Sequence, residues 1–103
     1  MNLNHSIFTI TCVWPARDGK SNIRCWGYYF TFNEAERVIL NNDTDIFECG
    51  YYTYAVIEEI RPGLLIRQRG EWWYRYKRIN SKDKISKCKK PKELIGTICF
   101  GLG

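Results

Sequence analysis

The 103-residue chain is 45% hydrophobic and 16% aromatic. This composition supplies enough apolar area for one packed core and excludes extensive disorder, and the chain is too short for two cores. No apolar run approaches the ~20 residues of a membrane span, and residues 1–14 lack a basic start, so we expect one soluble cytoplasmic domain. The net charge of +5 is uneven: residues 1–60 carry −4 and residues 61–103 carry +9, which indicates a basic surface for an anionic partner.

The first third of the sequence predicts two strands. Residues 6–14 alternate between apolar and polar types, as in a half-buried strand. The residues on one side of this strand are Phe8, Ile10, Cys12 and Trp14. Turn-forming residues fill 15–22 and indicate a hairpin loop, and the aromatic stretch 23–30 predicts the second strand, with a bulge at Gly27.

A helix is predicted next. Thr31 and Glu34 have the spacing of a capping box, so we expect a helix over about 32–41 that ends at the polar residues 41–43. The apolar residues predicted to share its buried face are Phe32, Ala35, Val38 and Ile39.

The second half predicts further strands. Residues 51–60 are β-branched and aromatic, and the turn 61–63 leads into a predicted hairpin of 64–67 and 71–78 around residues 68–70. Alternation in the second arm divides it into two sides. Trp72, Tyr74 and Tyr76 form the predicted core side, and Trp73, Arg75 and Lys77 the outward side.

For the C-terminal third, the sequence predicts a long basic loop or an extended edge segment over 80–90, a short helical turn near 91–95 that opens at Pro91, and a last strand over 97–103. The predicted fold class is α+β: a single domain, 1–103, with a mainly antiparallel sheet of 5–6 strands and one main helix packed on one face.

Catalytic and metal-binding patterns are missing from the sequence. The chain has one histidine, His5, no phosphate-binding glycine loop, and five cysteines without a C-x-x-C pair. Glu58 and Glu59 point to opposite faces of a strand, and the acidic group 43–48 lacks a calcium-loop pattern. We therefore expect a non-enzymatic protein without metal or cofactor, whose thiols are neutral. The cysteines are Cys12, Cys25, Cys49, Cys88 and Cys99.

Aromatic rings next to cations are the candidate ligand-binding feature, because rings stack on bases and guanidinium groups hold phosphates. Two places carry them. The candidate residues are Trp14, Arg17, Lys20, Arg24 and Trp26 in the first hairpin, and Trp73, Arg75 and Lys77 on the outward side of the later strand. The alternatives are an ordinary exposed hairpin and a solvated basic surface.

Four stretches carry a resemblance: FTFNEAERVILNNDTDIFE, YYTYAVIEE, WWYRY and KPKELIGTICFGLG. Together they resemble a family of small uncharacterised proteins of bacteria and their phages. The basic run over 82–90 stands where that family has a short acidic or neutral hairpin. The resemblance implies a phage counter-defence factor acting in the host cytoplasm, of the kind that captures cyclic or ADP-ribose-like nucleotide signals.

Four functional hypotheses follow. The first is a sponge that sequesters an anionic nucleotide signal, with a homo-oligomer helping a small domain to enclose it. The second is a protein inhibitor that docks on a host defence complex through Tyr and Trp anchors. The third is a nucleic-acid-binding module in the basic C-terminal half. An enzyme that cleaves the same signal ranks last.

Overall fold

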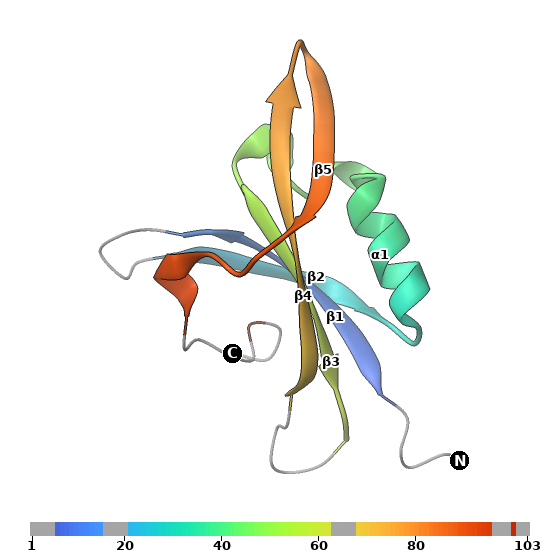
Figure 1. The fold of residues 1–103 in the computed structure, drawn as a ribbon. Coiled ribbons are helices and arrows are strands. Elements are labelled where there is room, and N and C mark those ends of the chain that lie inside the picture. The colour runs from blue at the N-terminus through green and yellow to red at the C-terminus, as the bar shows by residue number, and fades with distance from the viewer. Residues whose placement is uncertain (1–5, 16–20, 63–67, 96–99, 101–103) are drawn as a thin grey trace.

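The computed structural model describes residues 6–15, 21–62, 68–95 and 100, and shows a five-stranded antiparallel sheet with one helix against one face (Figure 1). The strands lie in the order β2-β1-β3-β4-β5. Their bounds are β1 Ile7–Trp14, β2 Asn22–Tyr29, β3 Tyr54–Ile60, β4 Gln68–Ile79 and β5 Lys82–Cys88. The helix α1 spans Phe32–Leu40, and short 3-10 turns occupy Asp43–Asp45, Glu48–Gly50 and Lys92–Leu94. The predicted α+β class is confirmed.

The capping box forms as predicted. Thr31 Oγ1 accepts a hydrogen bond from the Glu34 backbone N–H at 3.2 Å and donates one to Glu34 Oε1 at 2.8 Å. The helix buries Ala35 and Ile39 against the sheet, and Asn42, in a left-handed conformation, follows its C-terminal cap. Local chemistry therefore sets both ends of α1.

The strand β1 lies between β2 and β3 and is buried on both sides, which corrects the half-buried strand predicted from its alternation. Ile10 and Cys12 face α1, while Thr9, Thr11 and Val13 face the other side, and all five are at most 3% exposed. A bulge interrupts its pairing with β2, because Ile10 is opposite Gly27 while Thr11 is opposite Cys25.

The face of the sheet opposite α1 has its own apolar cluster. Leu94 and Phe100 from the C-terminal segment cover Val13, Val56 and Trp73. Figure 1 shows this segment and α1 on opposite sides of the sheet. The sheet is therefore the middle layer of the protein.

One prediction for the C-terminal half is wrong, and one of two alternatives is confirmed. Residues 68–70 lie inside β4 rather than in a turn, with a register shift opposite Glu59 and Ile60. Residues 82–88 form the edge strand β5, which pairs with β4 along its whole length, so the extended edge segment is confirmed and the loop is not. The predicted strand over 64–67 and the tip of the first hairpin, 16–20, lie outside the described residues, and of the predicted strand over 97–103 the structure describes only Phe100, which is in a turn. In the part of the chain that the structure describes, no helix is long and apolar enough to cross a membrane.

Candidate functional site

The hairpin of β4 and β5 extends beyond the rest of the sheet (Figure 1). Pairing of β3 with β4 stops at Tyr54 and Arg75, whereas pairing of β4 with β5 continues to Ile79 and Lys82. Asn80 and Ser81 connect the strands with φ of 51° and 63°, the left-handed pair that a two-residue type I′ turn requires. The end of the hairpin is therefore a two-stranded ribbon.

Four cationic side chains lie on the hairpin surface that faces away from α1. Alternation places them on the side of Trp73 and Cys88, opposite the side on which Tyr74 and Tyr76 enter the core. They are Arg75, Lys77, Lys82 and Lys84, and we call them the cationic face. All four are exposed, and none forms an ion pair with a described residue.

Two members of the cationic face oppose each other directly. Lys77 on β4 is the register partner of Lys84 on β5, and like charges directly opposite in a sheet are destabilising. Arg75 lies opposite Ser86, and its guanidinium carbon is 5.9 Å from the centroid of the Tyr54 ring. The cationic face thus concentrates positive charge without an internal counter-charge among the described residues.

The side of the hairpin that faces α1 has a different character. Tyr76 donates a hydrogen bond to Asp83, and this bond is the largest cause that raises the pKa of Tyr76 to about 12. Lys87 Nζ lies 3.4 Å from Glu36 Oε2, and Tyr74 donates to the same carboxylate. Carboxylates therefore neutralise this side, and the charge of the hairpin is one-sided.

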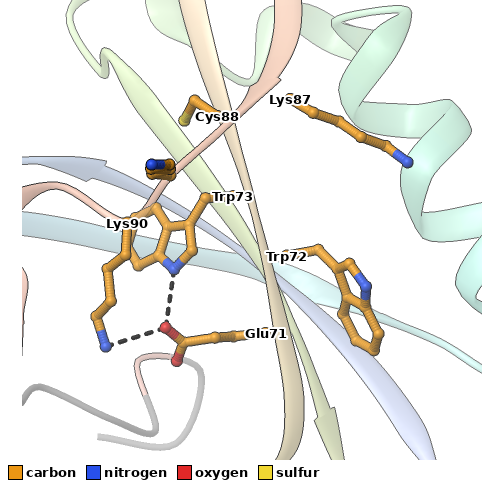
Figure 2. Close-up of a pocket in the computed structure, with 7 residues that line it drawn as sticks. Glu71, Trp72, Trp73, Lys87, Cys88 and Lys90 are labelled. Carbon is orange, nitrogen blue, oxygen red and sulfur yellow. Dashed lines mark hydrogen bonds and ion pairs between the residues drawn. The ribbon is translucent and has the colours of Figure 1, made fainter.

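A cleft of about 350 Å³ opens beside β4 where β5 ends. Its lining residues are Glu71, Trp72, Trp73, Lys87, Cys88, Lys89 and Lys90. Figure 2 shows the two indole rings pointing to opposite sides of the strand, with Glu71 between Trp73 and Lys90. The Glu71 carboxylate accepts a hydrogen bond from Trp73 Nε1 at 3.0 Å and lies 3.0 Å from Lys90 Nζ.

Two of the three side chains predicted to lie on the outward side of β4 are exposed to solvent. Arg75 and Lys77 are exposed as expected. Trp73 is 5% exposed, so the expectation that its ring lies on an open surface is wrong. The physical reason is that Leu94 and Phe100 cover it, with the Trp73 and Phe100 ring centroids 5.4 Å apart. Trp73 therefore adds little open surface to the cleft that it lines.

The other predicted place is the first hairpin. The Arg24 guanidinium carbon lies 4.2 Å from the Trp26 ring centroid, and Arg24 forms an ion pair with Glu48 at 3.4 Å. Trp14 is 42% exposed and stacks on Tyr51 at 6.3 Å between ring centroids. Arg17 and Lys20 lie outside the described residues. Because Glu48 already neutralises Arg24, this hairpin offers an anion less charge than the cationic face does.

The two predicted places do not meet. Trp26 packs against the core cluster on the α1 side, and Trp14 shares the side of Ile10 and Cys12. Arg75 and Lys77 lie on the other face of the sheet. A single small ligand therefore cannot contact both places.

Three of the thiols in the described part of the chain have raised pKa values. Burial is the largest cause that raises the pKa of Cys12 to about 12, and burial also raises the pKa of Cys88. The hydrogen bond to Asp45 raises the pKa of the Cys49 thiol. Raised pKa values lower the thiolate fraction and thus the nucleophilicity of these groups. The described residues also contain no group of three or more side chains that could hold a metal ion.

Comparisons with protein-family models, with curated proteins and with solved structures find no match. Function therefore has to follow from the geometry of the chain's own residues.

Sequence reasoning missed Lys82 and Lys84 as site residues because it left residues 80–90 open between a loop and an extended edge segment and predicted no pairing with β4. The signal was present in KDKISKC, where Lys82, Lys84, Ser86 and Cys88 alternate with Asp83, Ile85 and Lys87. Only one of the latter three is aliphatic, which hid the strand pattern.

Proposed function

We propose that this protein binds nucleic acid through the cationic face of the β4–β5 hairpin. The observation that carries the proposal is the direct opposition of Lys77 and Lys84, with Arg75 and Lys82 beside them and no carboxylate paired to any of the four among the described residues. Such an arrangement costs stability in the free protein and becomes favourable when phosphates lie against it.

The shape of the hairpin suits a polyanion. Side chains two positions apart on a strand are about 6.7 Å apart, so Arg75 and Lys77 on β4 and Lys82 and Lys84 on β5 form two short parallel rows. The major groove of a duplex is ~12 Å wide and admits a two-stranded ribbon. Lys77, Lys82 and Lys84 lie beyond the last residue pair of β3 and β4, on the part of the hairpin that projects from the rest of the sheet (Figure 1).

The chemistry of the face favours phosphate contacts over base recognition. Three of its four cations are lysines, which act as point charges, and only Arg75 has the planar fork suited to bidentate contacts. Phosphate contacts position a protein but do not read sequence. We therefore propose binding with little sequence preference and a strong dependence on salt.

Fluorescence anisotropy with labelled duplex and single-stranded oligonucleotides, titrated at several salt concentrations, tests the proposal. If all four cations neutralise phosphates, the slope of log affinity against log salt for a duplex is about −3.6, at ~0.9 per phosphate. The double variant K77Q/K84Q should lower the affinity and reduce the slope by about 1.8. A matched control is R78Q, on the same strand but on the α1 side, which should leave the slope close to the wild-type value.

Two results would reject this function. One is affinity that does not change with salt. The other is an R78Q variant whose slope of log affinity against log salt falls, for each charge removed, as much as that of K77Q/K84Q. Binding would then depend on the net charge of the protein and not on the cationic face.

A second candidate function is capture of a small anionic nucleotide in the cleft at the base of the hairpin. The favouring observation is its volume of about 350 Å³, within the ~300–1,000 Å³ typical of ligand pockets, with indole rings and Lys89 in its lining. The Glu71 carboxylate lines the same cleft and would repel an anion. Nucleic-acid binding is therefore the better supported function, and a signal sponge within phage counter-defence stays a proposal from the resemblance.

Calorimetry against cyclic dinucleotides and ADP-ribose separates the two functions. A sponge binds them at micromolar affinity or tighter, about −8 kcal/mol, and K89Q weakens that binding. Absence of heat with all of these ligands, together with salt-dependent oligonucleotide binding, leaves only the first function.

A further inference from the structure

The two edges of the described sheet differ in how they are protected. An exposed edge strand presents unpaired backbone N–H and C=O groups, and proteins commonly block such edges with lysines. The edge strand β5 carries Lys82, Lys84 and Lys87. The edge strand β2 carries a single charged residue, Arg24, and that charge is paired with Glu48 and stacked on Trp26.

Large apolar side chains are exposed along the β2 edge, which has a bulge but no lysine. Ile23 is 44% exposed and Tyr28 is 56% exposed. Their register partners Val13 and Thr9 face the side of the sheet away from α1, so Ile23 and Tyr28 lie on that side as well. The covering residues Leu94 and Phe100 pack against β1, β3 and β4 and leave this margin of the sheet open.

We propose that a second copy of this chain pairs its β2 antiparallel with β2 around a two-fold axis, which joins the two sheets edge to edge. The backbone groups of the two β2 strands would satisfy each other, and Ile23 and Tyr28 of both copies would be buried at the margins of the contact. The bulge at Trp26 leaves regular strand on both sides of it.

The charge distribution favours the β2 edge over the β5 edge for pairing with a second copy. The cationic face lies on β4 and β5, and β5 is separated from β2 by four strand spacings, about 19 Å. This distance exceeds twice the ~8 Å Debye length in physiological salt. Two chains joined at β2 therefore keep their strongest positive charges far apart, although each chain has a net charge of +5.

The same charges disfavour the competing pairings. A β5–β5 contact would bring two sets of lysines together. A β2–β5 contact is head to tail and gives a ring or an open filament, and it places the lysines of β5 in the contact, whereas β2–β2 pairing closes as a dimer. The contact uses different residues from the proposed nucleic-acid site, so either proposal can fail alone.

Analytical ultracentrifugation over the micromolar to millimolar range tests the dimer. We expect the wild-type mass to rise with concentration from 12.2 kDa towards twice that value, and the I23K/Y28K variant to stay monomeric. Two controls each introduce one such charge at another exposed apolar position: L40K on α1, 44% exposed, and I95K, 71% exposed. Both controls should dimerise like the wild type.

Circular dichroism checks that I23K/Y28K is folded, and hydrogen exchange gives a second readout that needs no variant. In the wild type, the exchange of β2 amides should slow as the concentration rises, while β5 amides exchange at a constant rate. A wild type that stays monomeric throughout, a dimer that I23K/Y28K leaves intact, or unchanged β2 exchange in a dimer would each overturn the proposal.

Discussion

The Glu58 carboxylate accepts a hydrogen bond of 3.1 Å from the backbone N–H of Phe100, 42 residues further along the chain. Glu58 is fully buried on β3 and lies directly opposite Glu71 on β4. Glu71 in turn lies 3.0 Å from Lys90. Two neighbouring glutamates thus hold residues on both sides of the 3-10 turn Lys92–Leu94 against the sheet, and this contact is what buries Trp73.

Replacement of Glu58 by alanine should destabilise the protein. The Phe100 N–H would lose its partner in a buried place, which costs about 1–3 kcal/mol. Glu58→Gln keeps an acceptor oxygen and should cost less. Urea unfolding followed by circular dichroism measures these changes, with Glu59→Ala, on the other face of β3, as the control. An E58A variant no less stable than E59A would contradict the role assigned to Glu58.

Thr31 should be a measurable contributor to helix stability. Its hydroxyl accepts from the Glu34 backbone N–H, and removal of such a cap by Thr31→Ala costs about 1 kcal/mol. Thr31→Ser retains the hydroxyl and should cost clearly less. Thermal unfolding of both variants checks this, and equal losses for the two would show that the methyl group, not the cap, is what matters.

The N-terminal half of the fold was predictable because its signals are local. The capping box Thr31/Glu34, the glycine bulge at Gly27 and the apolar alternation of β1 each act over a few residues, and the structure contains all three. What alternation could not show is that β1 is buried on both sides, because the second side is covered by residues far along the chain: Val13 packs with Leu94 and Phe100.

The candidate site was only half predictable. Arg75 and Lys77 were found from alternation in β4, but their partners Lys84 and Lys82 were not, because Asn80-Ser81 is a weaker turn signal than Asn-Gly and β5 has almost no apolar side. The burial of Trp73 was missed for a related reason, since it results from packing by Leu94 and Phe100 rather than from its own strand.

The phenol of Tyr76 should report on Asp83 at high pH. The hydrogen bond to Asp83 raises the Tyr76 pKa to about 12, above the ordinary value of ~10. Since the folded state holds this proton more tightly than the unfolded state, its contribution to stability is complete below pH 10 and is lost as the pH rises from about 10 to 12. Asp83→Asn removes the charge, so the Tyr76 pKa should fall towards its ordinary value.

Phenolate absorbance titrations of the wild type and of D83N measure this shift, and Tyr76→Phe identifies the signal as that of Tyr76. Identical titrations for wild type and D83N would show that Asp83 does not hold the proton.

Reversal of charge at Lys84 should raise stability and weaken nucleic-acid binding at once. Lys84→Glu replaces the repulsion with Lys77 by an attraction, which is worth about 0.2–1 kcal/mol at low salt and less as salt screens it. The matched control is Lys82→Glu, which makes the same charge change on the same face but lies opposite Ile79, so its gain in stability should be smaller.

Both variants should lose oligonucleotide affinity to a similar extent, because both remove a phosphate partner from the cationic face. Urea unfolding at two salt concentrations and anisotropy titrations on the same samples measure the two effects. A K84E variant that is less stable than the wild type at low salt would mean that Lys77 and Lys84 do not repel each other in the free protein, and the main physical support for a phosphate ligand would be lost.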